Sequence, residues 1–257
     1  MVPTVQATRY VTPLREGGSL PGIVEASDSG LYVLKFRGAG QGPLALVADL
    51  LGAEIGRALG LKVPDLVLME VDTALGRNEP DPEIRDLLKA SVGLNLGVDY
   101  LPGSVTFDPA AGDTVEADLA SSIVWLDAFI TNVDRTPRNP NLLWWHKTLY
   151  LIDHGAALYF HHNWPSAETM ARSRFPAIRD HVLLPWASRI EEADRRLRPQ
   201  FGNSLLASVI DQIPETWLAS EPAAAAERRA GYLAFFTQRL ETAAFVEEAV
   251  SARAHLV

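Results

Sequence analysis

The stretch NVDRTPRNPNLL, residues 132–143, places polar groups between two segments that favour burial. An apolar run, SSIVWLDAFI, precedes it, and a second, LLWW, begins at its end. Asp134 and Asn139 lie five residues apart in this stretch, and Pro137 and Pro140 stiffen it. A carboxylate in such a loop can orient a hydroxyl group and accept its proton. The residue types therefore indicate a loop that performs chemistry on a hydroxyl-bearing substrate.

A second carboxylate, Asp153, follows the segment LLWWHKTLYLID, which reads as two short strands. The amide oxygen of Asn139 and the carboxylate of Asp153 can together hold Mg²⁺, a hard cation that prefers oxygen ligands. The alternative is that these Asp and Asn residues only cap turns around the prolines, as such residues commonly do. For one residue alone the alternative is favoured. When Asp134, Asn139 and Asp153 are joined by a lysine that can bind nucleotide phosphates, the four residues stand in the order that such a site needs. The turn-capping alternative is then disfavoured.

That lysine is Lys35, in the apolar segment LYVLKF, where residues 31, 33 and 35 alternate onto one face. The chain has only four lysines against nineteen arginines. An unpaired ammonium group is costly to bury, so Lys35 either needs an anionic partner or lies at a strand end with its charge in water. The helix expected over residues 44–60 offers Asp49 and Glu54, about 140° apart around its axis. Helical angles place Glu54 nearer the apolar face, so we expect Glu54 to pair with Lys35.

Composition limits the classes of protein to which the chain can belong. Its 257 residues suffice for one large domain or for two lobes around a cleft, and 47% of them are hydrophobic. The longest apolar runs are too short to span a bilayer, and the start, MVPTVQATRY, lacks the pattern of a secretion signal. There is no cysteine, and the net charge of −9 argues against nonspecific binding to nucleic acid or anionic lipid. We expect a cytoplasmic protein.

The patterning changes character along the chain. The first third reads mostly as strands, with a hairpin turn at Asp28-Ser29-Gly30, and the part beyond about residue 114 reads mostly as helices. The pattern predicts an α+β protein with a strand-rich N-lobe, residues 1–102, and a helix-rich C-lobe, residues 103–257. The segments concerned are strands within 21–27, 31–36, 61–72 and 93–103, helices within 44–60, 79–91 and 113–130, two short strands within 142–153, and helices within 183–197, 203–213 and 222–249.

These motifs together resemble a known family. Asp-Arg-x-x-x-Asn at 134–139, two apolar strands and Asp-x-Gly at 153–155 resemble the catalytic and metal-binding segments of the protein-kinase-like superfold, in its phosphatidylinositol-kinase branch. The chain as a whole most resembles the short HipA-like kinases of bacteria. The segments that carry this resemblance lie within about residues 10–165 and are GGSLPG, VLKFRGAGQGP, the helix ending in ALGLKVP, DYLPG, NVDRTPRNPNLLWW and LIDHGAAL.

The resemblance implies a role for each matching residue. Asp134 would be the catalytic aspartate, Asn139 and Asp153 would hold Mg²⁺, and Lys35 would contact the α- and β-phosphates of ATP. Adenine would contact a hinge at Tyr100 and Leu101, and the family's phosphate loop would include Gly18 and Ser19. Three features depart from the family pattern, one being that the chain is shorter than the HipA toxins and lacks room for their additional N-terminal subdomain. His154 stands where many kinases have phenylalanine, and family spacing assigns the acid that pairs with Lys35 to Asp49 rather than Glu54.

The expected activity is ATP- and Mg²⁺-dependent transfer of a phosphoryl group to Ser or Thr of an unidentified protein acceptor. Two alternatives stay open on the sequence: a pseudokinase that binds nucleotide without transfer, and a kinase whose acceptor is a small molecule or a lipid. The histidines at 154, 161 and 162 could suggest a metal cluster. With no cysteine nearby, we expect packing or surface roles for them instead.

Overall fold

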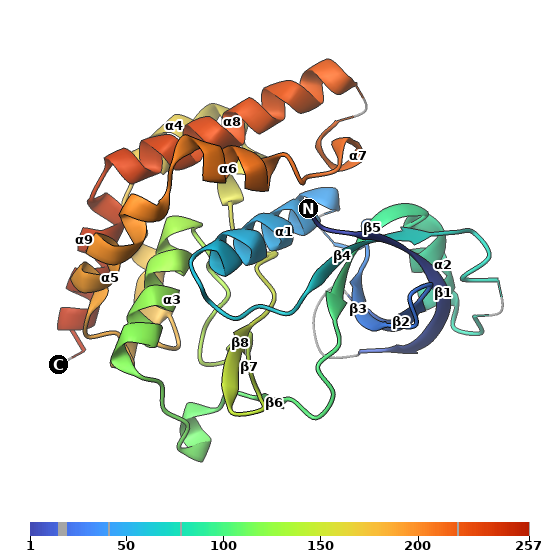
Figure 1. Cartoon of the computed structure of the whole chain (residues 1–257), viewed down its shortest axis with the longest axis horizontal. Coiled ribbons are helices and arrows are strands. Elements are labelled where there is room, and N and C mark those ends of the chain that lie inside the picture. The colour runs from blue at the N-terminus through green and yellow to red at the C-terminus, as the bar shows by residue number, and fades with distance from the viewer. Residues whose placement is uncertain (15–19, 41, 78, 220, 257) are drawn as a thin grey trace.

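The strands of the first hundred residues close into a barrel in the order β1-β2-β3-β5-β4 (Figure 1). The computed structural model describes residues 1–14, 20–40, 42–77, 79–219 and 221–256. Neighbouring barrel strands are antiparallel, except that β1 and β4 are parallel where the barrel closes. The barrel strands are β1 (Thr4–Pro13), β2 (Gly22–Ala26), β3 (Leu31–Lys35), β4 (Leu66–Val71) and β5 (Gly93–Asp99).

The hairpin between β2 and β3 confirms the turn expected from the sequence. The carboxylate of Asp28 accepts the N–H of Gly30 at 2.9 Å, and Ser29 adopts a left-handed conformation with φ of 67°. This turn sets the register between β2 and β3, in which Leu34 pairs with Gly22. On the other side of β3, its last residue, Lys35, pairs with Leu96 of β5. The lysine thus lies at the end of a barrel strand.

Helices make up most of the remaining chain. The predicted mixture of helices and strands is confirmed, and so are the individual helices over 44–60, 79–91 and 113–130, with slightly shorter bounds. The helices are α1 (Pro43–Ala58), α2 (Pro82–Ala90), α3 (Ala117–Phe129), α4 (Ala167–Arg172), α5 (Ile190–Leu197), α6 (Asn203–Ile210), α7 (Glu215–Leu218), α8 (Pro222–Glu241) and α9 (Ala244–Ala254). A second, three-stranded sheet contains β6 (Val105–Thr106), β7 (Leu142–Trp145) and β8 (Thr148–Leu151).

Two clusters of buried apolar side chains form the core. One fills the barrel, with Val24, Leu34 and Met69 fully buried. The other unites the helices of the second half with α1, although α1 follows the barrel strand β3 directly in the chain. Helix α1 accordingly lies between the barrel and the helices of the second half in Figure 1, whereas α2 lies beside the barrel. Helix α1 therefore connects the barrel to the helical part, because it is joined to β3 in the chain and packs among the helices.

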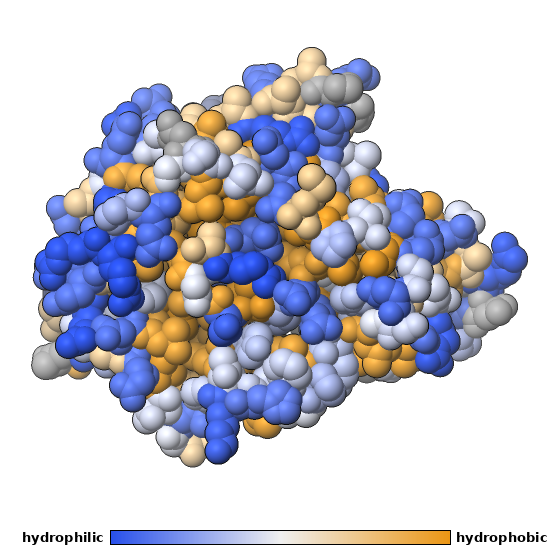
Figure 2. Space-filling view, viewed as in Figure 1, coloured by the Kyte–Doolittle hydropathy of each residue, from blue (hydrophilic) through white to orange (hydrophobic). Residues whose placement is uncertain are grey.

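Polar and charged residues cover much of the face seen in Figure 2, with apolar patches between them. This mixture is ordinary for a folded chain, because more than half of the surface of most proteins is apolar. Within the described residues, no helix combines the length and the hydrophobicity needed to cross a membrane.

Arg239 of α8 is fully buried and joins the ends of two helices. Its guanidinium donates to the carbonyl oxygens of Ala128 and Phe129, at the end of α3, at 2.6 and 2.7 Å. It also donates to the carbonyls of Met170 and Ala171, at the end of α4, at 3.2 and 3.3 Å. The C-termini of helices carry partial negative charge, so a cation is favourable at both. Burial lowers the pKa of Arg239 to about 9.

The histidines at 154, 161 and 162 do not form a metal cluster in the described structure. His161 is buried among aromatic rings, and its Nδ1 lies 2.9 Å from the hydroxyl of Tyr232, whereas His162 is exposed. Burial lowers the pKa of His161 to about 3. His161 is therefore a neutral packing residue, as we expected.

This burial makes stability depend on pH. The unfolded chain binds a proton at His161 below about pH 6.5 and the folded chain does not, so stability is lost as the pH falls through 6.5. Between pH 7.5 and 5.5, we expect His161 to lower the free energy of unfolding by about 1.4 kcal/mol. Urea unfolding of the wild type and of His161→Gln at both pH values measures this difference. Identical pH dependence in the two proteins would contradict the assignment.

Candidate functional site

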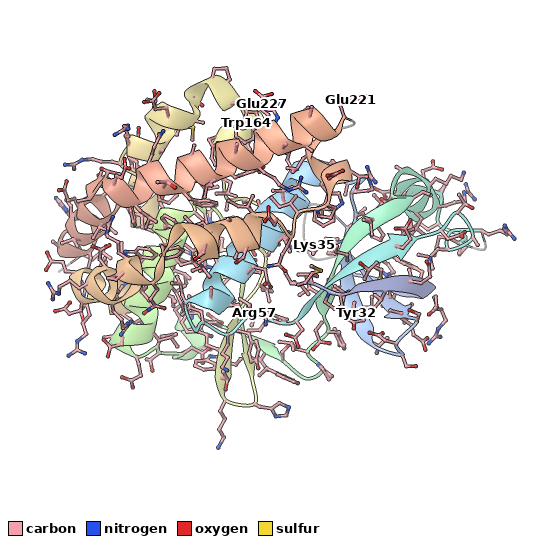
Figure 3. The ribbon with its side chains drawn as sticks, turned by 45° about the horizontal axis from the view of Figure 1, so that its top comes forward. Tyr32, Lys35, Arg57, Trp164, Glu221 and Glu227 are labelled. Carbon is pink, nitrogen blue, oxygen red and sulfur yellow. The ribbon has the colours of Figure 1, made fainter. Side chains whose placement is uncertain are left out.

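The ammonium group of Lys35 lies between two carboxylates from different parts of the chain. Its Nζ is 2.7 Å from Oδ2 of Asp49, in α1, and 2.7 Å from Oδ1 of Asp153, just beyond β8. The Lys35 and Asp49 side chains are only 14% and 8% exposed, and that of Asp153 is 47% exposed. Figure 3 shows Lys35 between the barrel and α1. The barrel, α1 and the β7–β8 hairpin therefore meet at one cation.

The expectation that Glu54 pairs with Lys35 is wrong. Glu54 instead accepts a hydrogen bond from Arg57 at 3.1 Å, toward the other end of α1, where Figure 3 labels Arg57. The choice of Glu54 assumed that α1 has one apolar face, which would point toward β3. Helix α1 has no single apolar face. Ten of its sixteen residues are buried, Asp49 among them, so its apolar positions do not indicate the direction of β3.

The charges of this cluster affect one another. Although burial alone would lower the pKa of Lys35, the negative charges of Asp153 and Asp49 raise it above its usual value. The charge of Lys35 in turn lowers the pKa of Asp153. Burial raises the pKa of Asp49 to about 6, although Lys35 and the N–H of His154, 2.6 Å from Oδ1, favour the carboxylate. Lys35 therefore stays charged at neutral pH.

Asp134 and Asn139, predicted from one loop, are in direct contact. The side-chain amide of Asn139 donates to Oδ2 of Asp134 at 2.8 Å. Reciprocal backbone bonds of 3.1 Å between Thr136 and Asn139 close a tight turn around Pro137 and Arg138. Burial, together with the negative charge of Asp153, raises the pKa of Asp134. The loop thus holds an acceptor of protons and an amide oxygen in a fixed relation.

The chemistry of Asn139 and Asp153 fits a magnesium site. Because the amide nitrogen of Asn139 faces Asp134, its amide oxygen is left to act as a ligand. Asp153 adds a partly exposed carboxylate and has a φ of 54°, a left-handed conformation that costs energy and is common at functional sites. Mg²⁺ is typically held by one or two such protein oxygens together with phosphates and water.

The hinge residues lie where the chain leaves the barrel. Tyr100 follows β5, and its N–H donates to the carbonyl of Leu31 at 3.0 Å, while the Leu101 side chain is buried. Their contact with adenine remains a prediction. Gly18 and Ser19, the predicted phosphate loop, lie outside the described residues. Two surface cavities, of about 520 and 500 Å³, are lined by residues outside the cluster around Lys35.

Sequence reasoning missed two residues, Asp127 and His181, that support the loop of Asp134 and Asn139. Both are buried, and the Nε2 of His181 lies 2.9 Å from Oδ2 of Asp127. Asp127 also accepts a hydrogen bond from Arg135 at 2.6 Å. A lone acid within the apolar run SSIVWLDAFI was a usable signal, because a buried charge requires a partner. For His181 the sequence offered no such signal.

The comparison with protein families agrees with this geometry. The model of the HipA-like kinase family matches residues 8–248. The chain belongs to the HipA-like kinase family. The match extends well beyond residue 165, so it includes the helices that carried no recognised motif. No curated protein sequence matches the chain significantly.

Two solved kinase structures resemble this HipA-like kinase. The proinflammatory kinase CtkA of Helicobacter pylori has a TM-score of 0.60 and 14% identity, covering 99% of this chain and 100% of CtkA. At this identity the likeness shows a shared fold. A Golgi casein kinase has a TM-score of 0.40 and 12% identity, over 94% of this chain and 72% of the other.

In this HipA-like kinase, Gly52 lets α1 approach the Asp-His-Gly segment closely. A methyl group at Gly52 would lie only 2.5 Å from Cβ of His154. His154 is itself buried, and burial lowers its pKa to about 3, so the imidazole is neutral and packs against α1 as an apolar residue would. This packing shows how a histidine can be buried in the Asp-His-Gly segment without a charge.

We therefore expect Gly52→Ala to lower the free energy of unfolding by about 1–3 kcal/mol, because the added methyl forces α1 and His154 apart. Gly56→Ala in the same helix is the matched control. Its methyl would first meet the flexible end of Leu126 at 3.2 Å, and alanine favours helix by about 1 kcal/mol. It should be neutral or stabilising in a urea titration. Equal effects of the two substitutions would exclude this role for Gly52.

Proposed function

We propose that this HipA-like kinase transfers the γ-phosphoryl group of ATP, with Mg²⁺, to the hydroxyl of a Ser or Thr residue in a protein. The observation that carries the proposal is the convergence of Lys35, Asp49 and Asp153 at one point. The contact between Asp134 and Asn139 adds a proton acceptor and a metal ligand from the adjacent loop.

In this proposal, residues 1–102 form a nucleotide-binding lobe and residues 103–257 form the lobe that holds the metal ligands and the acceptor. Lys35 binds the α- and β-phosphates, and Asp49 keeps its ammonium group aimed at them. Tyr100 and Leu101 form the hinge beside adenine. Gly18 and Ser19 belong to the phosphate loop and offer backbone amides to phosphate oxygens.

Asn139 and Asp153 would hold the metal through their side-chain oxygens. Mg²⁺, when bound, offsets the charge on the transferring phosphoryl group. Asp153 contacts Lys35 in the present structure, and its partly exposed carboxylate would also be available to the metal. The excess of negative charge in the Lys35, Asp49 and Asp153 cluster would favour a divalent cation beside it.

Asp134 would orient the acceptor hydroxyl and take up its proton. The hydrogen bond from Asn139 fixes the carboxylate, and partial burial raises its pKa, which increases its basicity. The proposal for a protein acceptor follows the family resemblance. Incubating the protein with γ-labelled ATP and a cell extract, then identifying what is labelled, distinguishes protein, lipid and small-molecule acceptors.

The first prediction separates chemistry from nucleotide binding. Asp134→Asn should leave the Kd of Mg·ATP nearly unchanged and lower turnover of γ-labelled ATP about 10²-fold, because it removes the proton acceptor. Asp153→Asn and Asn139→Ala should weaken Mg·ATP binding as well, because both act through the metal. Calorimetric titration and a turnover assay supply the two quantities. Full turnover in all three variants would refute the kinase mechanism, and ATP binding without turnover in the wild type would indicate a pseudokinase.

The second prediction concerns Lys35 and its partner. Lys35→Ala should weaken Mg·ATP binding by about 2 kcal/mol through the loss of a charge-assisted hydrogen bond. Asp49→Asn should lower kcat/KM about 10-fold or more, because the ammonium group loses a charged partner that orients it. Glu54→Gln, in the same helix, is the control and should keep wild-type kinetics. A larger loss of kcat/KM in Glu54→Gln than in Asp49→Asn would contradict the assignment of Asp49 as the partner of Lys35.

A further inference from the structure

The buried carboxylate of Asp127, in α3, is a hub beneath the catalytic loop. Its Oδ1 accepts a hydrogen bond from the amide of Asn132 at 2.9 Å, and its Oδ2 accepts one from Nε of Arg135 at 2.6 Å. Asn132 in turn accepts the backbone N–H of Asp134 through its side-chain oxygen at 3.2 Å. Asp127 therefore holds the residues that flank the proposed catalytic aspartate on both sides.

His181 reaches this hub from 54 residues further along the chain. The backbone N–H of Leu183 donates to Nδ1 of His181 at 3.0 Å, so Nδ1 is an acceptor. The hydrogen of the neutral ring must then reside on Nε2, which lies 2.9 Å from Oδ2 of Asp127. Burial lowers the pKa of His181, which keeps the ring neutral. His181 is thus a neutral donor whose tautomer is set by its own backbone.

The same segment is also attached to the loop through the backbone. The N–H of Val182 donates to the carbonyl of Arg135 at 2.9 Å. His181 and Val182 therefore contact both the carboxylate that holds the loop and the loop itself. Such a double attachment fixes the segment in register with Asp134 more tightly than either bond alone.

Arg135 extends the hub to the metal-binding segments. Its Nη1 donates to the carbonyl oxygen of Asn141, which lies two residues after Asn139. The same Nη1 donates to the carbonyl oxygen of Ile152 at 3.2 Å. Ile152 directly precedes Asp153. A rotation of the Asp127 carboxylate would therefore move Arg135 and, through it, the backbone beside both proposed metal ligands.

Arg135 and His181 both favour the charged form of the buried Asp127 carboxylate. Burial alone would raise the pKa of Asp127, yet the charge of Arg135 and the hydrogen bond from His181 hold it well below its usual range. The carboxylate and Arg135 form a fully buried ion pair. Without His181, Oδ2 would retain Arg135 as its only side-chain donor within the described structure, and the orientation of the carboxylate would depend on Arg135 and on Asn132 at Oδ1.

We propose that His181 is a positioning residue for phosphoryl transfer, which acts by donating from Nε2 to Asp127 and thereby orienting Asp134. The proposal rests on the function proposed above. It assigns a role to a residue that touches neither nucleotide nor metal, and it predicts that the donor to Asp127, rather than the bulk of the imidazole, determines the rate.

Two substitutions separate the two hydrogen bonds of His181. Glutamine carries an amide nitrogen near the place of Nε2 and keeps the donor to Asp127, but it loses the acceptor for Leu183. Asparagine carries an amide oxygen near the place of Nδ1 and keeps the acceptor for Leu183, but it loses the donor. We expect His181→Asn to lower kcat for turnover of γ-labelled ATP about 10-fold or more, and His181→Gln to retain at least about a third of it. The Kd of Mg·ATP should change less than kcat in both.

His161→Gln is the matched control, because His161 is also buried and bonded through a ring nitrogen, but to Tyr232, which is not part of the hub. It should shift the melting temperature without lowering kcat. Equal kcat in His181→Asn and His181→Gln, whether both high or both low, would overturn the positioning role. A wild-type chain that turns over no ATP would overturn the proposed function as well, so the two failures are distinguishable.

Discussion

Burying the ammonium group of Lys35 is the constraint on which the arrangement of this protein depends. A buried cation is costly unless anions and hydrogen bonds compensate it. The two compensating carboxylates come from α1 and from the segment after β8, which are 14 and 118 residues from Lys35 in the chain. Pairing one lysine therefore brings the barrel, the helix and the hairpin together, and the two carboxylates leave the cluster with a net negative charge.

Helix α1 connects this cluster to the rest of the molecule. It follows a barrel strand in the chain, yet its side chains belong to the core of the helical part. Gly52 allows it to lie against His154, the residue after Asp153, so the distance between the two carboxylates around Lys35 depends on backbone packing. Because protein interiors are closely packed, a small change at the contact between Gly52 and His154 would shift the carboxylates around Lys35.

Two buried guanidinium groups bind backbone carbonyls on either side of the loop that contains Asp134 and Asn139. Arg239 binds the carbonyls at the end of α3, just before the loop, and Arg135 binds the carbonyls of Asn141 and Ile152, beyond it. Arg135 is paired with Asp127, whereas Arg239 relies on two helix ends and the ring of Phe245. Both use the several donors of one planar group to bind several backbone carbonyls at once. They supplement the hydrogen bonds that the loop makes within itself.

The sequence by itself determined the local elements and the motif. The hairpin at Asp28, the helix over α1, the strands β7 and β8, and the contact between Asp134 and Asn139 all follow from short segments, in which periodicity and turn residues act directly. Only the tertiary structure decided which acid meets Lys35 and what holds the loop. Helix α1 is covered on nearly every side, so its pattern does not indicate where β3 lies, and Asp49 rather than Glu54 faces the lysine. His181 and Asp127 are 54 residues apart, and their contact depends on the packing of segments whose own sequences contain no trace of it.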